Sequence, residues 1–184
     1  MKKILILGVL VAAGFIGESA HADYWEASAG LNYNRSEFSG NSYSWTRRFG
    51  GSIGYNFSDS STIEVGYQHS YDRNHFEGFE DSTYDDKVVS LNIVWNVFGR
   101  NAQIQPYLKG GIGQLNRVAT ISDSLGRTQV LHLDQMTGVA GAGLKILLTK
   151  TFAIRMEGTG YLIGAKISTW KDNFGATFGV SLYY

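Results

Sequence analysis

The sequence predicts an all-β fold, an eight-stranded antiparallel up-and-down transmembrane β-barrel with short periplasmic turns and long extracellular loops. Three observations predict it: an export signal at the N-terminus, apolar residues that recur at every second position, and connections that alternate between short and long. The 184 residues include 23 glycines, one proline and no cysteine, with 16 basic and 16 acidic side chains. This composition argues against a nucleic-acid-binding chain and excludes disulfide, zinc-thiolate and thiol-nucleophile chemistry.

The first twenty-two residues have the pattern of a secretory signal peptide. Lys2 and Lys3 precede an apolar run from Ile4 to Ile16, and Ala20-His21-Ala22 supplies a small-residue cleavage site. The run is shorter than the roughly 20 residues that a membrane-spanning helix needs, which disfavours the alternative of an uncleaved anchor. We therefore expect residues 1–22 to be removed and residues 23–184 to form the outer-membrane barrel.

Five segments show clear alternation between apolar and small or polar residues. In the last of them, Phe174, Ala176, Phe178, Val180, Leu182 and Tyr184 share one face. Segments of this kind, about 9 to 11 residues long, can cross a bilayer as tilted strands with one face toward lipid. The five predicted strands are 25–34, 48–57, 62–68, 89–97 and 173–184.

Three further segments alternate more faintly, at 106–113, 140–146 and 152–157. They bring the number of predicted strands to eight, and an even number allows the sheet to close without exposed edges. The connections 58–61, 99–103 and 148–151 are short, whereas 35–42, 72–86, 116–128 and 164–172 are long and polar. This alternation places both termini on the short-turn side, which is the periplasmic side in outer-membrane barrels.

These segments resemble the small eight-stranded outer-membrane barrels of Gram-negative bacteria, the OmpX, Ail and opacity-type proteins and the OmpA transmembrane domain. The resemblance is carried by 174–184, by the hairpin 54–67 and by Gln105-Pro-Tyr-Leu-Lys-Gly-Gly-Ile-Gly113. It implies an outer-membrane location, a monomer surrounded by lipid and lipopolysaccharide, and no cofactor. It also implies that the barrel-assembly machinery reads a C-terminal signal, here Phe178, Val180, Leu182 and Tyr184, with tyrosine where phenylalanine is commoner.

The alternation places seven charged residues on the inward face of the predicted strands. An eight-stranded barrel encloses a space that side chains fill, so we expect these charges to pair with one another. The alternative is that they line or gate a narrow pore. The predicted interior charge network is Glu26, Arg48, Glu64, Lys109, Lys145, Arg155 and Glu157.

A second group of basic residues lies near or beyond the predicted outer rim, where side chains can meet lipopolysaccharide phosphates or simply keep loops soluble. These candidates are Arg35, Arg47, Arg73, Arg117, Arg127, Lys166 and Lys171. The long connection 72–86 is acidic and contains His75, but it lacks the spacing of an EF-hand. We expect a solvated face there rather than a cation site.

Neither catalytic nor metal-binding residues are predicted. Some eight-stranded barrels modify lipid A with a His and a Ser two residues apart, but His69 is followed directly by Ser70, which points to the other face of a strand. We therefore expect a non-enzymatic protein that displays surface loops for adhesion, surface interaction or envelope integrity. The alternative is a narrow passive channel for ions or small solutes.

Overall fold

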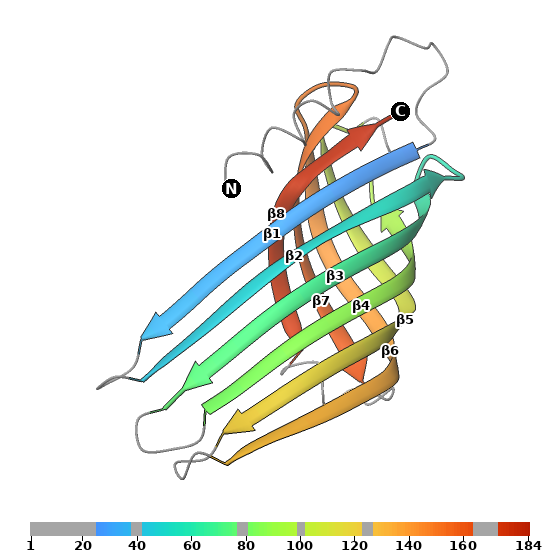
Figure 1. The fold of residues 1–184 in the computed structure, drawn as a ribbon. Helices are drawn as coiled ribbons and strands as arrows, with labels where there is room; N and C mark the ends of the chain where they lie inside the picture. Colours follow the sequence, from blue (N-terminus) through green and yellow to red (C-terminus); the bar gives the residue numbers. More distant parts are fainter. Residues whose placement is uncertain (1–24, 38–41, 77–80, 99–101, 123–126, 164–172) are drawn as a thin grey trace.

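The computed structural model is an all-β closed barrel of eight antiparallel strands, each hydrogen-bonded to the next in the sequence (Figure 1). It describes residues 25–37, 42–76, 81–98, 102–122, 127–163 and 173–184. The predicted signal peptide lies outside these residues. No helix in the described part of the chain is long and apolar enough to cross a membrane. The strands are β1 (Trp25–Glu37), β2 (Tyr43–Asn56), β3 (Ser61–His75), β4 (Asp81–Asn96), β5 (Ile104–Ser122), β6 (Thr128–Leu147), β7 (Phe152–Ile163) and β8 (Phe174–Tyr183).

The barrel closes between β1 and β8, where residues 26–31 pair with 178–183. Just beyond this ladder, Trp25 and Tyr184 exchange two backbone hydrogen bonds, with N···O distances of 3.2 and 2.9 Å. The two ends of the described chain therefore meet at the same end of the barrel as the tight turn at Ser58 to Ser61. This arrangement confirms the predicted closed, eight-stranded topology.

Side chains alternate between an outward apolar face and a polar interior. On β4, Leu91 and Ile93 are more than half exposed on the outer wall, whereas Ser90 and Asn92 are buried inside. A water-soluble barrel would have the opposite arrangement, since it buries its apolar side chains. The exposed apolar wall is what a membrane-spanning barrel presents to lipid.

The strands are longer on the outer side than the sequence pattern predicts. The segment 116–128, expected to be a loop, contains strand residues up to Ser122, and the predicted acidic loop 72–86 contains strand residues Asp72–His75 and Asp81–Asp86. Both faces of these extensions carry polar or charged residues, and the few apolar ones, such as Val118 and Ala119, also lie on opposite faces. Because neither face is consistently apolar, the hydropathy of this part of the sequence shows no period of two.

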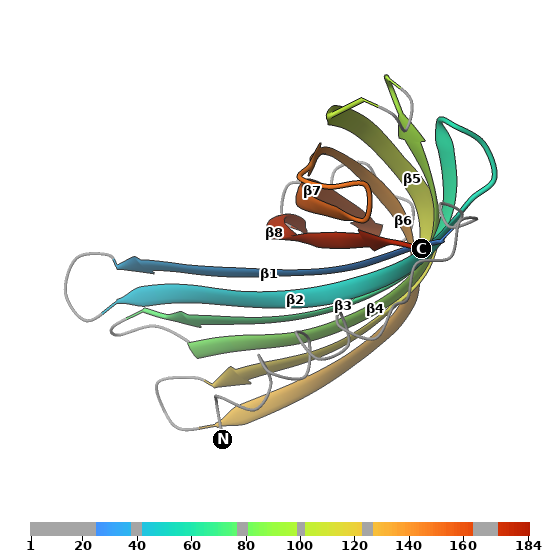
Figure 2. The same ribbon diagram turned by 90° about the horizontal axis from the view of Figure 1, so that it is seen from above.

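Six of the strands continue as an open sheet above the closed barrel. β1 pairs with β8 only up to Leu31, and β6 pairs with β7 only from Thr137 onward, although β1 to β6 remain paired with one another further out. Figure 2 shows these strands reaching beyond the ends of β7 and β8. Among the described residues, the sheet thus has two unpaired edges, β1 residues 32–37 and β6 residues 128–136.

Candidate functional site

The interior of the barrel contains a compact group of six charged residues, which we call the interior ion cluster. Three carboxylates and three cations make it neutral overall, and all six side chains are at most 10% exposed. Alternation along the strands aims each of them inward, and the closed barrel brings strands distant in sequence face to face. The cluster consists of Glu26, Glu64, Lys109, Lys145, Arg155 and Glu157.

Arg155 lies at the centre of the interior ion cluster. Its Nη1 is 2.9 Å from Glu64 Oε2 and 3.5 Å from Glu26 Oε1, and its guanidinium also contacts the carboxylate of Glu157. Lys109 bridges the same carboxylates, with Nζ 2.8 Å from Glu64 Oε1 and 3.0 Å from Glu157 Oε1. One arginine therefore joins acids from three strands, β1, β3 and β7, and Lys109 adds β5.

Lys145 and Tyr107 complete the packing of the cluster. Lys145 Nζ lies 2.6 Å from Glu26 Oε2 and 5.2 Å from the centre of the Tyr107 ring. The Tyr107 hydroxyl donates to Glu157 at 2.7 Å and accepts from Arg155 Nε at 2.8 Å. The sequence analysis did not identify Tyr107 as part of this network, although its inward position follows from the alternation of 106–113.

The periplasmic end of the interior is closed by buried side chains. The polar residues of this end form local hydrogen bonds, such as the 2.6 Å bond from Thr62 Oγ1 to Asn56 Oδ1. Each of the following is at most 4% exposed: Asn56, Thr62, Val94, Asn96, Gln105, Ala153 and Ser181. Together with the interior ion cluster, these side chains fill the periplasmic end of the barrel; we call this filled region the buried floor.

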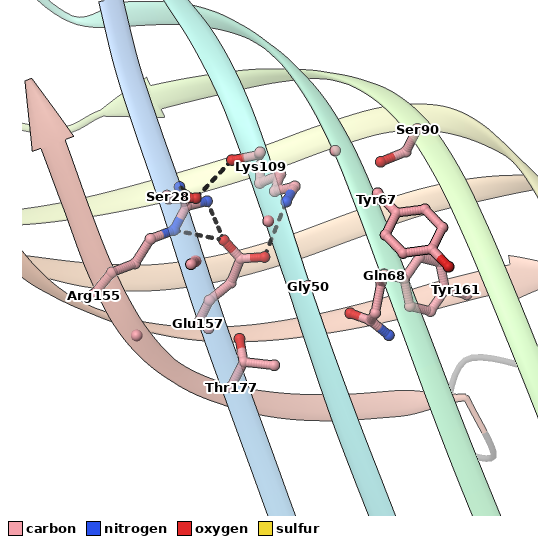
Figure 3. A pocket seen from close by; sticks show the side chains of 16 residues that line it. Ser28, Gly50, Tyr67, Gln68, Ser90, Lys109, Arg155, Glu157, Tyr161 and Thr177 are labelled. Atoms are coloured by element: carbon pink, nitrogen blue, oxygen red, sulfur yellow. Dashed lines mark hydrogen bonds and ion pairs between the residues drawn. The ribbon is translucent and has the colours of Figure 1, made fainter. Parts of the chain in front are cut away.

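Toward the outside, the interior opens in steps. A central cavity of about 60 Å³ borders Lys109, Arg155 and Glu157, and Figure 3 shows these side chains together with Ser28 and Tyr161 around it. This volume has room for a few water molecules. A smaller cavity of about 20 Å³ shares Gln68 and Tyr161 with it.

The outermost cavity, which we call the outer vestibule, has a volume of about 380 Å³. It shares Arg48, Asp72, Arg117 and Asn173 with the small cavity below, so the cavities form a series along the barrel. The remaining lining residues are Thr46, Asn74 and Tyr84. The series ends at the interior ion cluster.

Arg48 is the predicted interior charge that the structure does not bring into the cluster. It lies in the outer half, where its Nη1 donates to the carbonyl oxygen of Phe174 at 2.7 Å. The reason is the register: Arg48 stands opposite Ser70, six residues further along β3 than Glu64. Inward direction was predictable from parity, but the position along the barrel axis depends on strand pairing.

Three of the candidate lipopolysaccharide contacts lie on the outer wall of neighbouring strands. Arg35, Arg47 and Arg73 alternate there with aromatic rings: Arg47 Cζ is 6.0 Å from the centre of the Tyr71 ring, and Trp45 stands between Arg35 and Arg73 in the strand pairing. Arg35 also forms a 2.7 Å ion pair with Glu37. Arg127 immediately precedes β6, and Lys166 and Lys171 lie outside the described residues.

The prediction that Arg117 contacts lipopolysaccharide was wrong. Its side chain points into the vestibule, where Nε and Nη2 donate to Asp86 at 2.7 and 2.6 Å and Nη2 donates to Asn173 Oδ1 at 2.7 Å. The predicted loop from Asn116 is in fact strand, and its parity turns Arg117 inward. Arg117 therefore belongs to the barrel interior rather than to the lipid-facing wall.

The acidic residues of 72–86 do not form one group, because the alternation of side chains along β3 and β4 places them on both faces of the sheet. Asp72 and Asp86 face the interior, whereas Asp81 and Asp85 face outward and lie 2.5 Å from His75 Nδ1 and 2.9 Å from His69 Nε2. Within the described ranges, no group of three or more potential metal ligands is present. His69 and Ser70 lie on opposite faces of β3, with Ser70 buried.

Comparison with known proteins identifies the group to which this barrel belongs. Residues 7–184 match the family model described as the outer membrane protein beta-barrel domain. The chain belongs to this family. It is an outer-membrane β-barrel, which agrees with the predicted location and family. A comparison with curated proteins found no match.

Solved barrels of the same fold come from several bacteria. The N-terminal β-barrel domain of Pseudomonas aeruginosa OprF aligns with a TM-score of 0.58 and 16% identity, covering 89% of this chain and 100% of that one. Yersinia pestis Ail, in complex with the heparin analogue sucrose octasulfate, aligns with a TM-score of 0.51 and 14% identity, covering 89% of this chain and 97% of that one. Neisserial surface protein A aligns with a TM-score of 0.50 and 11% identity, covering 87% of this chain and 95% of that one. At these identities the likeness concerns the fold.

Proposed function

We propose that this outer-membrane barrel is a non-enzymatic surface-interaction protein that binds an extended segment of another protein along its open sheet. The observation that carries this proposal is that residues 128–136 of β6 have no strand partner on their β7 side within the part of the chain that the structure describes. A free strand edge presents unused backbone donors and acceptors, and extended peptides bind such edges by strand addition. Adhesion through this edge is the surface role that we infer.

The free edge lies above the apolar band of the barrel. In the cross-strand row that contains Phe49, the outward residues of β3 to β6 are His69, Lys87, Asn116 and Asp134. Charged side chains are costly on the lipid-facing wall, so this row marks the outer boundary of the hydrocarbon. The edge of β6 from Thr128 to Asp134 is then available to partners outside the cell.

The β6 edge also offers side chains on both faces. Val130 is 51% exposed and Leu131 is 47% exposed, and they point to opposite faces of the sheet. An added strand would cover apolar surface on each face while its backbone completes the ladder. By contrast, the edge of β1 carries Arg35 and Glu37, and charged residues protect an edge against pairing.

Strand parity supplies a sharp test. The backbone N–H of Leu147 donates to Gln103 on the β5 side, whereas that of Leu148 donates to Phe152 on the β7 side. Since the register between β5 and β6 is continuous, even-numbered residues of β6 direct their N–H groups to the free edge. His132→Pro therefore removes a donor from the edge without removing a β5–β6 hydrogen bond, whereas His132→Thr keeps that donor.

The experiment compares the adhesion of cells that carry the wild type, His132→Pro or His132→Thr to immobilised extracellular-matrix proteins at equal surface levels. We expect His132→Pro to reduce adhesion about tenfold, or about 1.4 kcal/mol, because one backbone hydrogen bond to the added strand is lost. His132→Thr should adhere like the wild type. Equal adhesion of all three, or no adhesion by the wild type, contradicts the proposal.

Arg35, Arg47 and Arg73 supply a second contact, to the phosphates of the surrounding lipopolysaccharide. Guanidinium groups bind phosphate oxygens with paired hydrogen bonds, and these three lie just outside the apolar band among aromatic rings. This contact would anchor the barrel in the outer leaflet and support envelope integrity. Its partner is lipid, whereas the partner of the β6 edge is a polypeptide.

A narrow channel is the second candidate, because the cavities lead from the vestibule to the interior ion cluster. The buried floor favours a closed barrel instead. Planar-bilayer recordings of the refolded protein distinguish the two, since reproducible unit conductance supports the channel and its absence supports the closed interior.

The enzymatic alternative has its own test. If the protein does not modify lipid A, mass spectra of lipid A from cells with and without its expression should be identical.

A further inference from the structure

Arg48 differs from the other interior cations because no carboxylate lies within ion-pair distance of it in the described chain. Its Nη1 donates to the Phe174 carbonyl oxygen, and its buried Nε has no hydrogen-bond partner among the described residues. Arg48 as a whole is half-buried, and a partly desolvated guanidinium without a carboxylate beside it favours an anionic or strongly polar partner.

The backbone of β8 holds Arg48 in place. A Cβ atom at Gly175 would overlap the guanidinium, so the side chain fits only because this residue is glycine. Together with the 2.7 Å bond to Phe174, this contact fixes the guanidinium across the interior, from β2 to the start of β8. A fixed guanidinium loses less conformational entropy when it binds a ligand.

Arg117 provides the contrast within the same vestibule. Both oxygens of Asp86 accept hydrogen bonds from it, and Asn173 accepts another, so its charge is neutralised by Asp86 and its Nε and Nη2 donors are used. Arg48 and Arg117 contact adjacent residues, Phe174 and Asn173, and therefore lie at the same depth of the vestibule. Of these two arginines, Arg48 is the one that has no carboxylate partner among the described residues.

Asp72 is the complementary group. On β3 it stands opposite Thr46, diagonal to Arg48, but Arg48 reaches to β8 instead, and no ion pair of Asp72 occurs among the described residues. Arg48 and Asp72 both line the vestibule, whose volume of about 380 Å³ is in the range of small-molecule sites. The vestibule thus offers one cation and one carboxylate that are not paired with each other.

We propose that the outer vestibule is a binding site for small carboxylate-bearing molecules of the amino-acid type, with the carboxylate on Arg48 and the ammonium group facing Asp72. Arginine binds carboxylates through two parallel hydrogen bonds. Asp72 and Asp86 disfavour ligands with several negative charges, so the site should prefer a zwitterion to phosphate. This inference does not depend on the β6 edge.

The test is a titration of the full refolded barrel in detergent micelles, followed by the NMR shifts of its arginine Nε–Hε groups. The probes are glycine, acetate and inorganic phosphate. We expect saturable binding of glycine, weaker binding of acetate and the weakest binding of phosphate. Arg48→Gln should weaken glycine binding about tenfold, because a charge-assisted contact is removed. The matched control is Lys87→Gln, which removes an outward-facing cation of β4 in the same cross-strand row as Phe49 and should leave binding unchanged.

Two further variants keep the inference testable if Arg48→Gln does not fold. Asp72→Asn should weaken glycine binding and leave acetate binding the same or stronger, whereas Gly175→Ala should displace Arg48 and weaken both. Electrophoresis of boiled and unboiled samples verifies that each variant is a closed barrel. The inference is overturned if glycine does not bind, if phosphate binds more tightly, or if Lys87→Gln has the same effect as Arg48→Gln.

Discussion

Lys145 Nζ lies 2.6 Å from Glu26 Oε2, which joins β6 to β1 across the barrel interior although the residues are 119 positions apart. Both side chains are almost completely buried, at 1% and 4% exposure. Burying two charges is unfavourable unless each is paired and hydrogen-bonded. The pair is therefore a sensitive measure of the integrity of the whole cluster.

Removing either partner of this pair should destabilise the barrel, and the two effects should not be additive. Glu26→Gln leaves Lys145 buried without its carboxylate, and we expect a loss of about 3–5 kcal/mol in the free energy of unfolding. Lys145→Met should cost less, because Glu26 still lies 3.5 Å from Arg155. The double variant should be more stable than the sum of the single effects predicts, as measured by urea unfolding in lipid vesicles. Additive effects would show that the pair is not coupled.

A second prediction concerns the glycine beneath Tyr107. A Cβ atom at Gly143 would overlap the Tyr107 ring, which crosses over this residue to reach Glu157 on β7. Gly143→Ala should therefore destabilise the barrel by about 1–3 kcal/mol through overpacking. Gly110→Ala is the matched control, since a Cβ atom there meets nothing within 4 Å. Urea unfolding should show little change for the control, and equal losses would contradict this account.

The membrane boundary predicts a position-dependent cost for an added charge. Leu91 faces lipid in the apolar band, so Leu91→Arg should destabilise the barrel by about 2–4 kcal/mol. Asn116 also faces outward, but it lies in the row where charged residues begin, and Asn116→Arg should cost about 1 kcal/mol or less. Unfolding in vesicles measures both. A similar cost at the two positions would place the membrane boundary elsewhere.

The terminal strand should control assembly in the outer membrane. Phe178, Val180 and Leu182 share the outward face of β8, and Tyr184 closes the barrel through two backbone hydrogen bonds with Trp25. If the barrel-assembly machinery reads these side chains, Tyr184→Ser lowers the amount of folded protein in the membrane severalfold. Tyr184→Phe keeps the aromatic ring and should assemble normally. The unboiled fraction that migrates as closed barrel in electrophoresis is the measurement, and normal assembly of Tyr184→Ser would remove Tyr184 from the proposed signal.

The sequence anticipated the membrane-spanning part of the strands better than the part above it. In the apolar band one face must contact lipid, so residues such as Leu91 and Ile93 reveal the strand by their period. Beyond the band both faces meet water, and 116–122 and 81–86 carry no apolar alternation, although they are strands. The open sheet and its β6 edge could not be foreseen, because they follow from the shorter pairing of β7 and β8.

In the segments where the alternation is visible, the sequence by itself determined the side of the wall on which a residue lies, because successive side chains of a strand point in opposite directions. It thereby identified inward charges such as Glu26 and Arg155, but not Asp72, Asp86 and Arg117 further out. Only the tertiary structure decided which of them meet: the register of the closed barrel sets the height of each residue along the axis. That register joins Lys145 to Glu26, whereas it leaves Arg48 in the vestibule with no carboxylate partner among the residues that the structure describes.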